Sequence, residues 1–231
     1  SGGIFLNHSG ACNLFTPAGT GFAYDASAAG AQNGAYKGEG VSDVPATLDG
    51  AKGAPANGGG GGNNHNNSGG GGANLSAGGN GGGNRSAGPL GCNTAGNQGR
   101  GGKVLSSSSG TKIFMGGGGG AGHANNGSAS LNYGGNGGGL IFIWANDLIG
   151  NGRLITANGG TGGASTADGA GGGGGGGTII MHVSNYTGST IIRSNGGNGG
   201  LSDNGFTNAR CFGGGGGGSG GAIYFTGATP P

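Results

Sequence analysis

The sequence has few charges, few prolines and no long apolar run. Only 7% of its 231 residues are charged, which argues against disorder because solvated disordered chains usually carry a larger share. The formal net charge of +2 is too small to indicate nucleic acid or an anionic membrane surface as a partner. No apolar run approaches the roughly 18 residues of a membrane-spanning helix. We therefore expect neither nucleic-acid binding nor membrane insertion.

Cysteine is equally scarce. The three cysteines, Cys12, Cys92 and Cys211, are widely spaced along the chain. A metal cluster or a disulfide scaffold needs more cysteines at closer spacing. We expect one disulfide and one free or buried thiol, and the sequence leaves the pairing open.

Specific catalytic and metal-binding motifs are also missing. Residues 217–221 read GGSGG and match the G-x-S-x-G pattern around Ser219, but chance produces such matches in a chain that is one-third glycine. None of the four histidines has an acidic residue in a triad-like context, and the seven acidic residues form no calcium loop. We expect no enzymatic activity, no catalytic residue, no metal and no cofactor. A structural calcium ion at a turn is an open alternative.

Glycine is present in large excess, at 73 of 231 residues. Collagen is excluded because the chain has only 6 prolines and no Gly-X-Y period. A flexible linker is the ordinary interpretation of a run such as 171–177. Here, however, the glycine runs alternate with short blocks rich in β-branched and aromatic residues, which is the composition of β-strands. These blocks are GIFLN, NLFT, KVL, TKIFM, LIFIWANDLI, RLITA, TIIMHV, TIIRS and AIYFTG.

The glycine runs and apolar blocks form an internal repeat. Residues 134–163 and 171–200 both read as a glycine stretch, an apolar strand, a polar turn, a second short strand and N-G-G-x-G-G. In this alignment Leu140 and Thr178 begin equivalent strands. A truncated third copy runs from Gly213 into AIYFTG, and residues 101–120 are a more distant relative with the strand before the glycines.

Backbone geometry gives the glycine runs a structural role. Polyglycine can form an extended three-residue helix that rises about 3.1 Å per residue, close to the roughly 3.3 Å of a β-strand. Such a helix makes no internal hydrogen bonds, so each of its N–H and C=O groups must find a partner outside it. Glycine allows neighbouring helices to approach closely enough to bond to one another. We therefore predict a hydrogen-bonded glycine core with apolar strands on its flanks.

The predicted fold class is all-β or irregular: packed polyglycine II helices with short β-strands and little or no α-helix. Residues 1–56 are expected to form an N-terminal strand and loop region. Residues 57–231 are expected to form the glycine-rich repeat region, continuous with 1–56 in one folded domain. The glycine–asparagine stretch at 57–100 is interpreted either as further glycine helices or as an exposed loop.

Aromatic residues between the glycine runs are the candidate ligand-binding groups. Tyr133, Tyr186, Phe206 and Phe212 are expected in turns, where aromatic rings often mediate surface recognition. The alternative is that these rings fold back and cover the glycine helices. Trp144, by contrast, alternates with Phe142 on a strand and is predicted to lie in the packed core. We expect loops to carry recognition, namely 123–133, 164–170 and 201–212, and an edge strand near 223–226 to be available for subunit pairing.

The segments IFMGGGGGAGHANNG and GGNGGGLIFIWANDLIGNGRLITANGG carry a resemblance. They resemble glycine-rich repeat modules of large secreted surface proteins of Bacteroidota-type bacteria, which are adhesins or filament components. The expected architecture is also similar to the polyglycine II tip adhesins of T-even-like phages. The resemblance implies an extracellular, non-enzymatic structural or adhesive module. Its implied partners are other subunits or domains of the same surface assembly and a cell-surface glycan or protein.

Two alternatives to a bacterial surface module are kept. One is the receptor-binding tip of a phage tail fibre, which would also bind cell-surface glycans. The other is an ice-binding protein, which needs a flat, regular face of small residues or threonine. The threonine and serine positions in this sequence are irregular, so ice binding is the lesser alternative.

Overall fold

A computed structural model describes residues 34–44, 49–63, 66–86, 97–105, 112–124, 132–166, 168–203 and 210–231. This part of the chain contains no α-helix, which confirms the prediction of a non-helical fold of short strands and irregular segments. The strands are β1 (Asn84–Ser86), β2 (Leu140–Ile149), β3 (Arg153–Thr156), β4 (Ser165–Thr166), β5 (Thr178–Thr187), β6 (Thr190–Arg193), β7 (Ser202–Asp203), β8 (Arg210–Phe212) and β9 (Ala222–Phe225).

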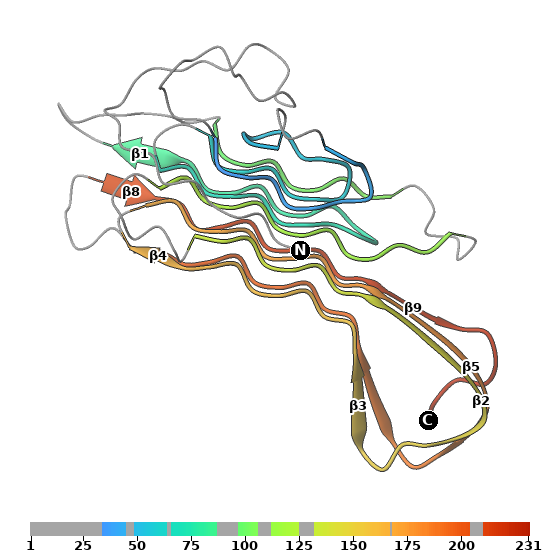
Figure 1. Cartoon of the computed structure of the whole chain (residues 1–231). Helices are drawn as coiled ribbons and strands as arrows, with labels where there is room; N and C mark the ends of the chain where they lie inside the picture. The colour runs from blue at the N-terminus through green and yellow to red at the C-terminus, as the bar shows by residue number, and fades with distance from the viewer. Residues whose placement is uncertain are drawn as a thin grey trace.

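The glycine runs form extended segments that lie side by side along the molecule (Figure 1). The strands β2, β3, β5, β6 and β9 gather at one end of this bundle, and β1, β4 and β8 lie at the other end. We name the extended segments as tracts, in chain order: A (34–40), B (57–63), C (66–74), D (78–83), E (97–103), F (116–124), G (132–139), H (157–163), I (168–177), J (194–200) and K (213–221).

Tract I lies in the centre of the bundle and bonds to six other tracts. Its amides donate to three tracts in strict rotation, so that every third residue bonds to the same neighbour. Its carbonyl groups accept from three further tracts with the same period of three. The donor bonds of 2.7–2.9 Å run from Gly171, Gly174 and Gly177 to tract H, from Gly172 and Gly175 to tract F, and from Gly173 and Gly176 to tract K; the acceptor bonds come from tracts J, G and C.

Tract C is a second centre with the same pattern. Its amides donate to tracts D, I and B, and its carbonyl groups accept from tracts F, E and K, again every third residue. Because the two central tracts share contacts with tracts F and K, one hydrogen-bonded network joins them. Backbone groups that would be unsatisfied in an isolated extended chain are therefore paired within the bundle.

The close approach of the tracts explains why the central residues are glycine. A Cβ atom added to Gly172 would lie 2.1 Å from the carbonyl oxygen of Gly70, and one added to Gly174 would lie 1.9 Å from that of Asn136. Real Cβ atoms do not come this close to backbone oxygen, so a larger residue would push the tracts apart.

The strands at one end continue the tracts and keep their register. β2, β5 and β9 form a parallel sheet in that order, with Leu140 beside Thr178 and Thr178 beside Ala222. β3 and β6 form a second parallel pair, and β4 pairs with β7. The residues that begin the aligned sequence repeats are therefore direct neighbours, which confirms the repeat and its third, truncated copy.

An apolar core lies between the two sheets. Ile179, Met181 and Val183 point inward from β5 and are fully buried, with Ala157 beside them. Ile141 and Ile143 of β2, Ile155 of β3, Ile192 of β6, and Ile223 and Phe225 of β9 pack around this cluster. The core therefore sits beyond the end of the glycine bundle and joins β2-β5-β9 to β3-β6.

Several expectations for the first half of the chain need correction or fall outside the description. The KVL and TKIFM blocks were predicted as strands, but residues 103–105 and 112–115 form none. These blocks instead border tracts E and F, where tertiary contacts override their strand propensity. GIFLN and NLFT lie outside the described residues. In the 57–100 stretch, tracts B, C, D and E are hydrogen-bonded into the bundle, so those residues are not an exposed loop.

Candidate binding surface on the outer face of the sheet

Exposed apolar side chains gather on the face of β2-β5-β9 that points away from the core. Phe142 is 62% exposed and Trp144 is 83% exposed. The prediction that Trp144 lies in the packed core is therefore wrong. Its neighbours Ile141 and Ile143 take the inward positions, and alternation along a strand then sends Phe142 and Trp144 outward.

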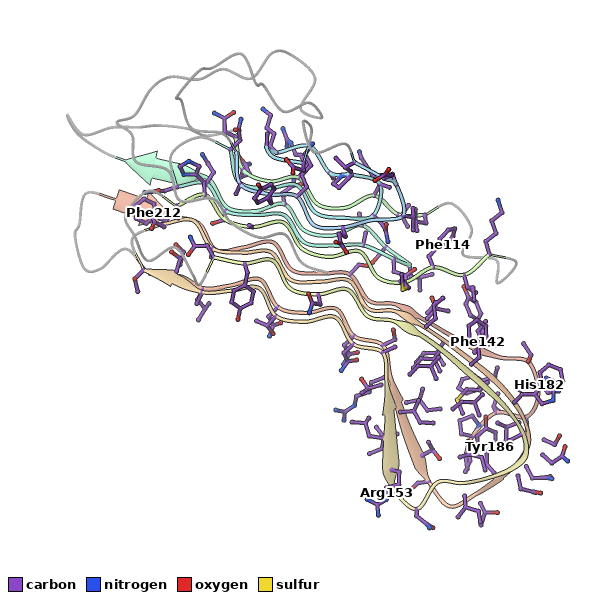
Figure 2. The ribbon with its side chains drawn as sticks, in the orientation of Figure 1. Phe114, Phe142, Arg153, His182, Tyr186 and Phe212 are labelled. Carbon is purple, nitrogen blue, oxygen red and sulfur yellow. The ribbon has the colours of Figure 1, made fainter. Side chains whose placement is uncertain are left out.

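Trp144 is held in place by a histidine on the neighbouring strand. The rings of Trp144 and His182 lie 4.1 Å apart between centroids, with 30° between their planes. Nδ1 of His182 is 3.0 Å from the Thr226 hydroxyl, so these two groups share a hydrogen bond. The bond fixes the imidazole, and the imidazole supports one side of the indole. Figure 2 shows Phe142 and His182 on the outer side of the sheet.

The parallel register extends this surface across all three strands. Phe142 lies beside Ile180, and Ile180 lies beside Tyr224. We call the surface formed by Leu140, Phe142, Trp144, Ile180, His182 and Tyr224 the aromatic face. Aromatic rings with one apolar side and one polar group are typical of interfaces, because they bury area with little loss of side-chain freedom.

A small pocket continues the aromatic face toward the glycine bundle. Its lining includes Phe114 and Lys112 from the segment before tract F, and Tyr224 from the aromatic face. The Thr178 hydroxyl donates to the carbonyl oxygen of Phe114 at 2.7 Å, which ties this segment to the start of β5. The pocket therefore lies where the aromatic face meets the segment before tract F. The other lining residues are Asn74, Leu75, Leu105, Ile113, Thr178 and Ala222.

The structure does not bring together the four aromatic residues singled out from the sequence. Tyr133 is 48% exposed on tract G, and Phe206 lies outside the described residues. Tyr186 is in β5, between the two sheets and packed against the core (Figure 2). Phe212 is in β8 at the opposite end and is buried. Two of the four therefore lie in strands and not in the expected turns.

Other predicted groups give no further site within the described residues. Cys12 and Cys92 lie outside them, and Cys211 lies in β8. The described residues contain no cluster of histidine, cysteine and acidic side chains that could hold a metal. The Ser219 hydroxyl accepts the amide of Asn74 at 2.8 Å and donates to the carbonyl of Gly220 at 3.1 Å, so it ties tract C to tract K.

The side chains whose pKa values are shifted lie away from the aromatic face. Burial lowers the pKa of Lys37, and the nearby Asp49 opposes this shift. Burial raises the pKa of Asp49 and also that of the Tyr186 phenol. The aromatic face itself has no acidic or basic side chain other than His182, so its recognition chemistry is apolar and hydrogen-bonding.

Sequence reasoning missed the aromatic face because both sides of β2 are apolar. A strand that alternates apolar and polar residues reveals its buried side, but LIFIW offers apolar residues to both sides. The signal that was present is the pairing of Phe142 and Trp144 on one side with isoleucines on the other.

Comparisons with known proteins identify no relative of this chain. No protein-family model matches it, no curated protein matches it, and no solved structure matches it. No helix in the described residues is long and apolar enough to cross a membrane.

Proposed function

We propose that this chain is an extracellular, non-enzymatic structural or adhesive module of a bacterial cell-surface protein or filament. In this proposal the glycine bundle is a stiff scaffold, and the aromatic face binds a glycan or protein on a cell surface. The observation that carries the adhesive role is the exposure of Trp144 and Phe142 on a sheet whose inner side is a packed core.

The scaffold is proposed to consist of polyglycine II helices. The hydrogen bonds of tracts I and C repeat every third residue, as expected for an extended helix with three residues per turn. A β-strand would instead direct its bonds to two sides with a period of two. Six neighbours around each central tract also favour a three-fold helix over a strand.

Binding through a rigid face suits such a scaffold. Trp144 is supported by His182, and the sheet beneath them is fixed by the buried Ile179 and Met181. A preformed apolar surface loses little conformational freedom on binding, so more of its contact energy appears as affinity. Tracts F, H and J end at the other end of the bundle, near β4 and β8 (Figure 1). Residues 125–131, 167 and 204–209 of the loops predicted to carry recognition lie outside the described residues. The aromatic face is thus a binding surface at the end of the bundle away from β4 and β8.

The test is adhesion of the purified protein to bacterial and host cells and to an array of glycans. Trp144→Ala and Phe142→Ala should each weaken binding at least about tenfold, as expected for central aromatic contacts. Leu154→Ala is the matched control, because Leu154 is also exposed and apolar but lies on the second sheet. If Trp144→Ala and Phe142→Ala bound as tightly as the wild type and the Leu154→Ala control, the aromatic face would not be the binding surface.

Ice binding is a second candidate, favoured by one observation. Asn158 and Thr161 of tract H, and Asn195 and Asn198 of tract J, are exposed at a spacing of three residues. On extended glycine helices this spacing corresponds to about 9 Å, so the polar groups form a regular array. Freezing-point depression with thermal hysteresis would support this function, and its loss in Thr161→Tyr would assign it to the array.

A further inference from the structure

One side of the bundle has a groove between tracts J and K in which backbone groups have no partner. The carbonyl groups of Gly215 and Gly218 accept no hydrogen bond from any described residue. The amides of Gly196 and Gly199, on the neighbouring tract, donate to none. Two acceptors and two donors thus line the same open groove.

We call each copy of the sequence repeat a pass of the chain. In the preceding pass the equivalent groove lies between tracts H and I, and tract J itself fills it. Gly174 occupies in tract I the place that Gly218 has in tract K, and its carbonyl accepts the amide of Gly197 at 2.8 Å. On the other side, the amides of Gly159 and Gly162 in tract H donate to the carbonyl groups of tract J. Gly196 and Gly199 are their equivalents in the next pass. The open groove therefore has the bonding pattern of a missing tract.

Glycines in tract K give independent evidence for that tract. A Cβ atom on Gly217 or Gly220 would meet no described atom closer than 4.0 Å, so packing among the described residues does not require glycine there. At the equivalent positions of tract I, a Cβ on Gly173 would lie 2.2 Å from the Gly197 oxygen, and one on Gly176 would lie 2.4 Å from the Ser194 oxygen. Tract J is what makes glycine necessary in tract I. The presence of glycine at Gly217 is explained if another tract lies beside tract K in the position that tract J has beside tract I.

The strands at the end of the groove are open in the same way. β6 pairs with β3 on one side and has no strand on the other side within the described residues. Asn158 accepts the amide of Asn195 at 2.8 Å through its side-chain oxygen, and Asn195 holds the same place in the next pass. An incoming segment would therefore find a strand edge followed by a tract groove.

The opposite edge of the bundle is closed to such addition. Tract I contacts tract G through Gly174, and tract K contacts tract I through Gly218. A Cβ on either residue would lie 1.9 Å from a carbonyl oxygen of the facing tract, so both positions require glycine. The equivalent residue of tract G is Asn136, and its side chain would enter any tract added on that side. The chain is therefore extendable at the J–K groove and capped at tract G.

We propose that the J–K groove docks a glycine-rich extended segment from another chain of the same surface assembly. The segment consists of a short apolar strand, which pairs in parallel with β6, followed by G-G-x-G-G, which runs parallel to tract J and antiparallel to tract K. This inference rests on the proposed structural role, and it names the partner and the mode of assembly. Glycine is required in the segment at the positions equivalent to Gly197 and Gly200, because a Cβ on those residues would lie 1.8 and 2.0 Å from carbonyl oxygens of tract H, the counterpart of tract J in the docked complex.

The probe is a labelled synthetic peptide with the sequence of residues 190–201, TIIRSNGGNGGL, which takes this place in the preceding pass. We expect saturable binding by fluorescence anisotropy to the full chain and slower amide exchange of Gly196 and Gly199 in NMR spectra of the complex. Gly217→Val should weaken binding at least about tenfold without affecting folding, because no described atom lies closer than 4.0 Å to the added Cβ. Gly139→Val is the matched control, since Gly139 is equally open but lies on the capped edge.

A second control changes the peptide. Valine at the positions corresponding to Gly197 and Gly200 should abolish binding. A Cβ on these residues of tract J would lie 1.8 and 2.0 Å from the carbonyl oxygens of Gly160 and Gly163 in tract H, and tract J takes the place of tract H in the docked complex. Equal binding by Gly217→Val, or no slowing of exchange at Gly196 and Gly199, would overturn the docking site. Amide exchange in tract I separates the two failures. Protected tract I amides without peptide binding refute the groove alone, whereas unprotected tract I amides refute the scaffold and the groove together.

Discussion

The amide of Gly175 donates to the carbonyl oxygen of Gly117 at 2.8 Å, which joins two glycine runs that lie far apart in the sequence. Such bonds, repeated every third residue, replace the side-chain packing that ordinarily holds a domain together. Ordering glycine costs more backbone entropy than ordering any other residue. The stability of the bundle must therefore come from many backbone bonds formed together, with the apolar core between the sheets at one end.

Amide exchange should distinguish central tracts from the open edge. The amides of 171–177 all have partners, so they should exchange much more slowly than those of Gly196, Gly199 and Gly217, which have none among the described residues. The measurement is hydrogen–deuterium exchange resolved by NMR. Exchange of 171–177 at the random-coil rate would mean that this run is a linker.

A single added methyl group should have opposite consequences at two glycines. Gly172→Ala places a Cβ 2.1 Å from a backbone oxygen and should lower the free energy of unfolding by at least about 2 kcal/mol. Gly217→Ala places its Cβ no closer than 4.0 Å to any described atom and should change the free energy of unfolding by no more than about 0.5 kcal/mol. Denaturant unfolding followed by circular dichroism provides the comparison. Equal losses in the two variants would contradict the arrangement of the tracts.

The two faces of the sheet should differ in their contribution to stability. Met181→Ala removes a fully buried side chain and should cost about 2–5 kcal/mol. Trp144→Ala should cost less than about 1 kcal/mol, because the indole is 83% exposed. Trp144 is the only tryptophan, so its fluorescence should be red-shifted and readily quenched by acrylamide in the folded protein. A blue-shifted, protected emission would contradict the exposed aromatic face.

The Tyr186 phenol gives a prediction for alkaline pH. Its hydroxyl is buried and has no hydrogen-bond partner among the described residues, and burial raises its pKa above the usual 10.0. Because the folded-state pKa lies above the unfolded value, the stabilising effect of the protonated phenol is complete below pH 10 and is lost as pH rises through the folded pKa. Tyr186→Phe should match the wild type in stability at neutral pH, or exceed it slightly, and lose less stability above pH 10. The check is the unfolding midpoint measured across pH 7–11, with Tyr133→Phe as the control, because the Tyr133 side chain on tract G is 48% exposed.

The sequence by itself determined the main architecture. Glycine runs alternating with β-branched blocks excluded helices, and the alignment of Leu140 with Thr178 identified strands that prove to be direct neighbours. That prediction succeeded because parallel stacking of equivalent repeats preserves register.

Only the tertiary structure decided which side chains face outward and which backbone groups are left open. Trp144 and Met181 both lie in apolar strands, yet one is exposed and the other buried, because the second sheet covers a single face. Gly173 and Gly217 are the same residue in equivalent tracts, yet one is enclosed and the other bare. Sequence fixes the chemistry of each position, but burial depends on which tract lies beside it, and hydrogen bonds between distant tracts decide that.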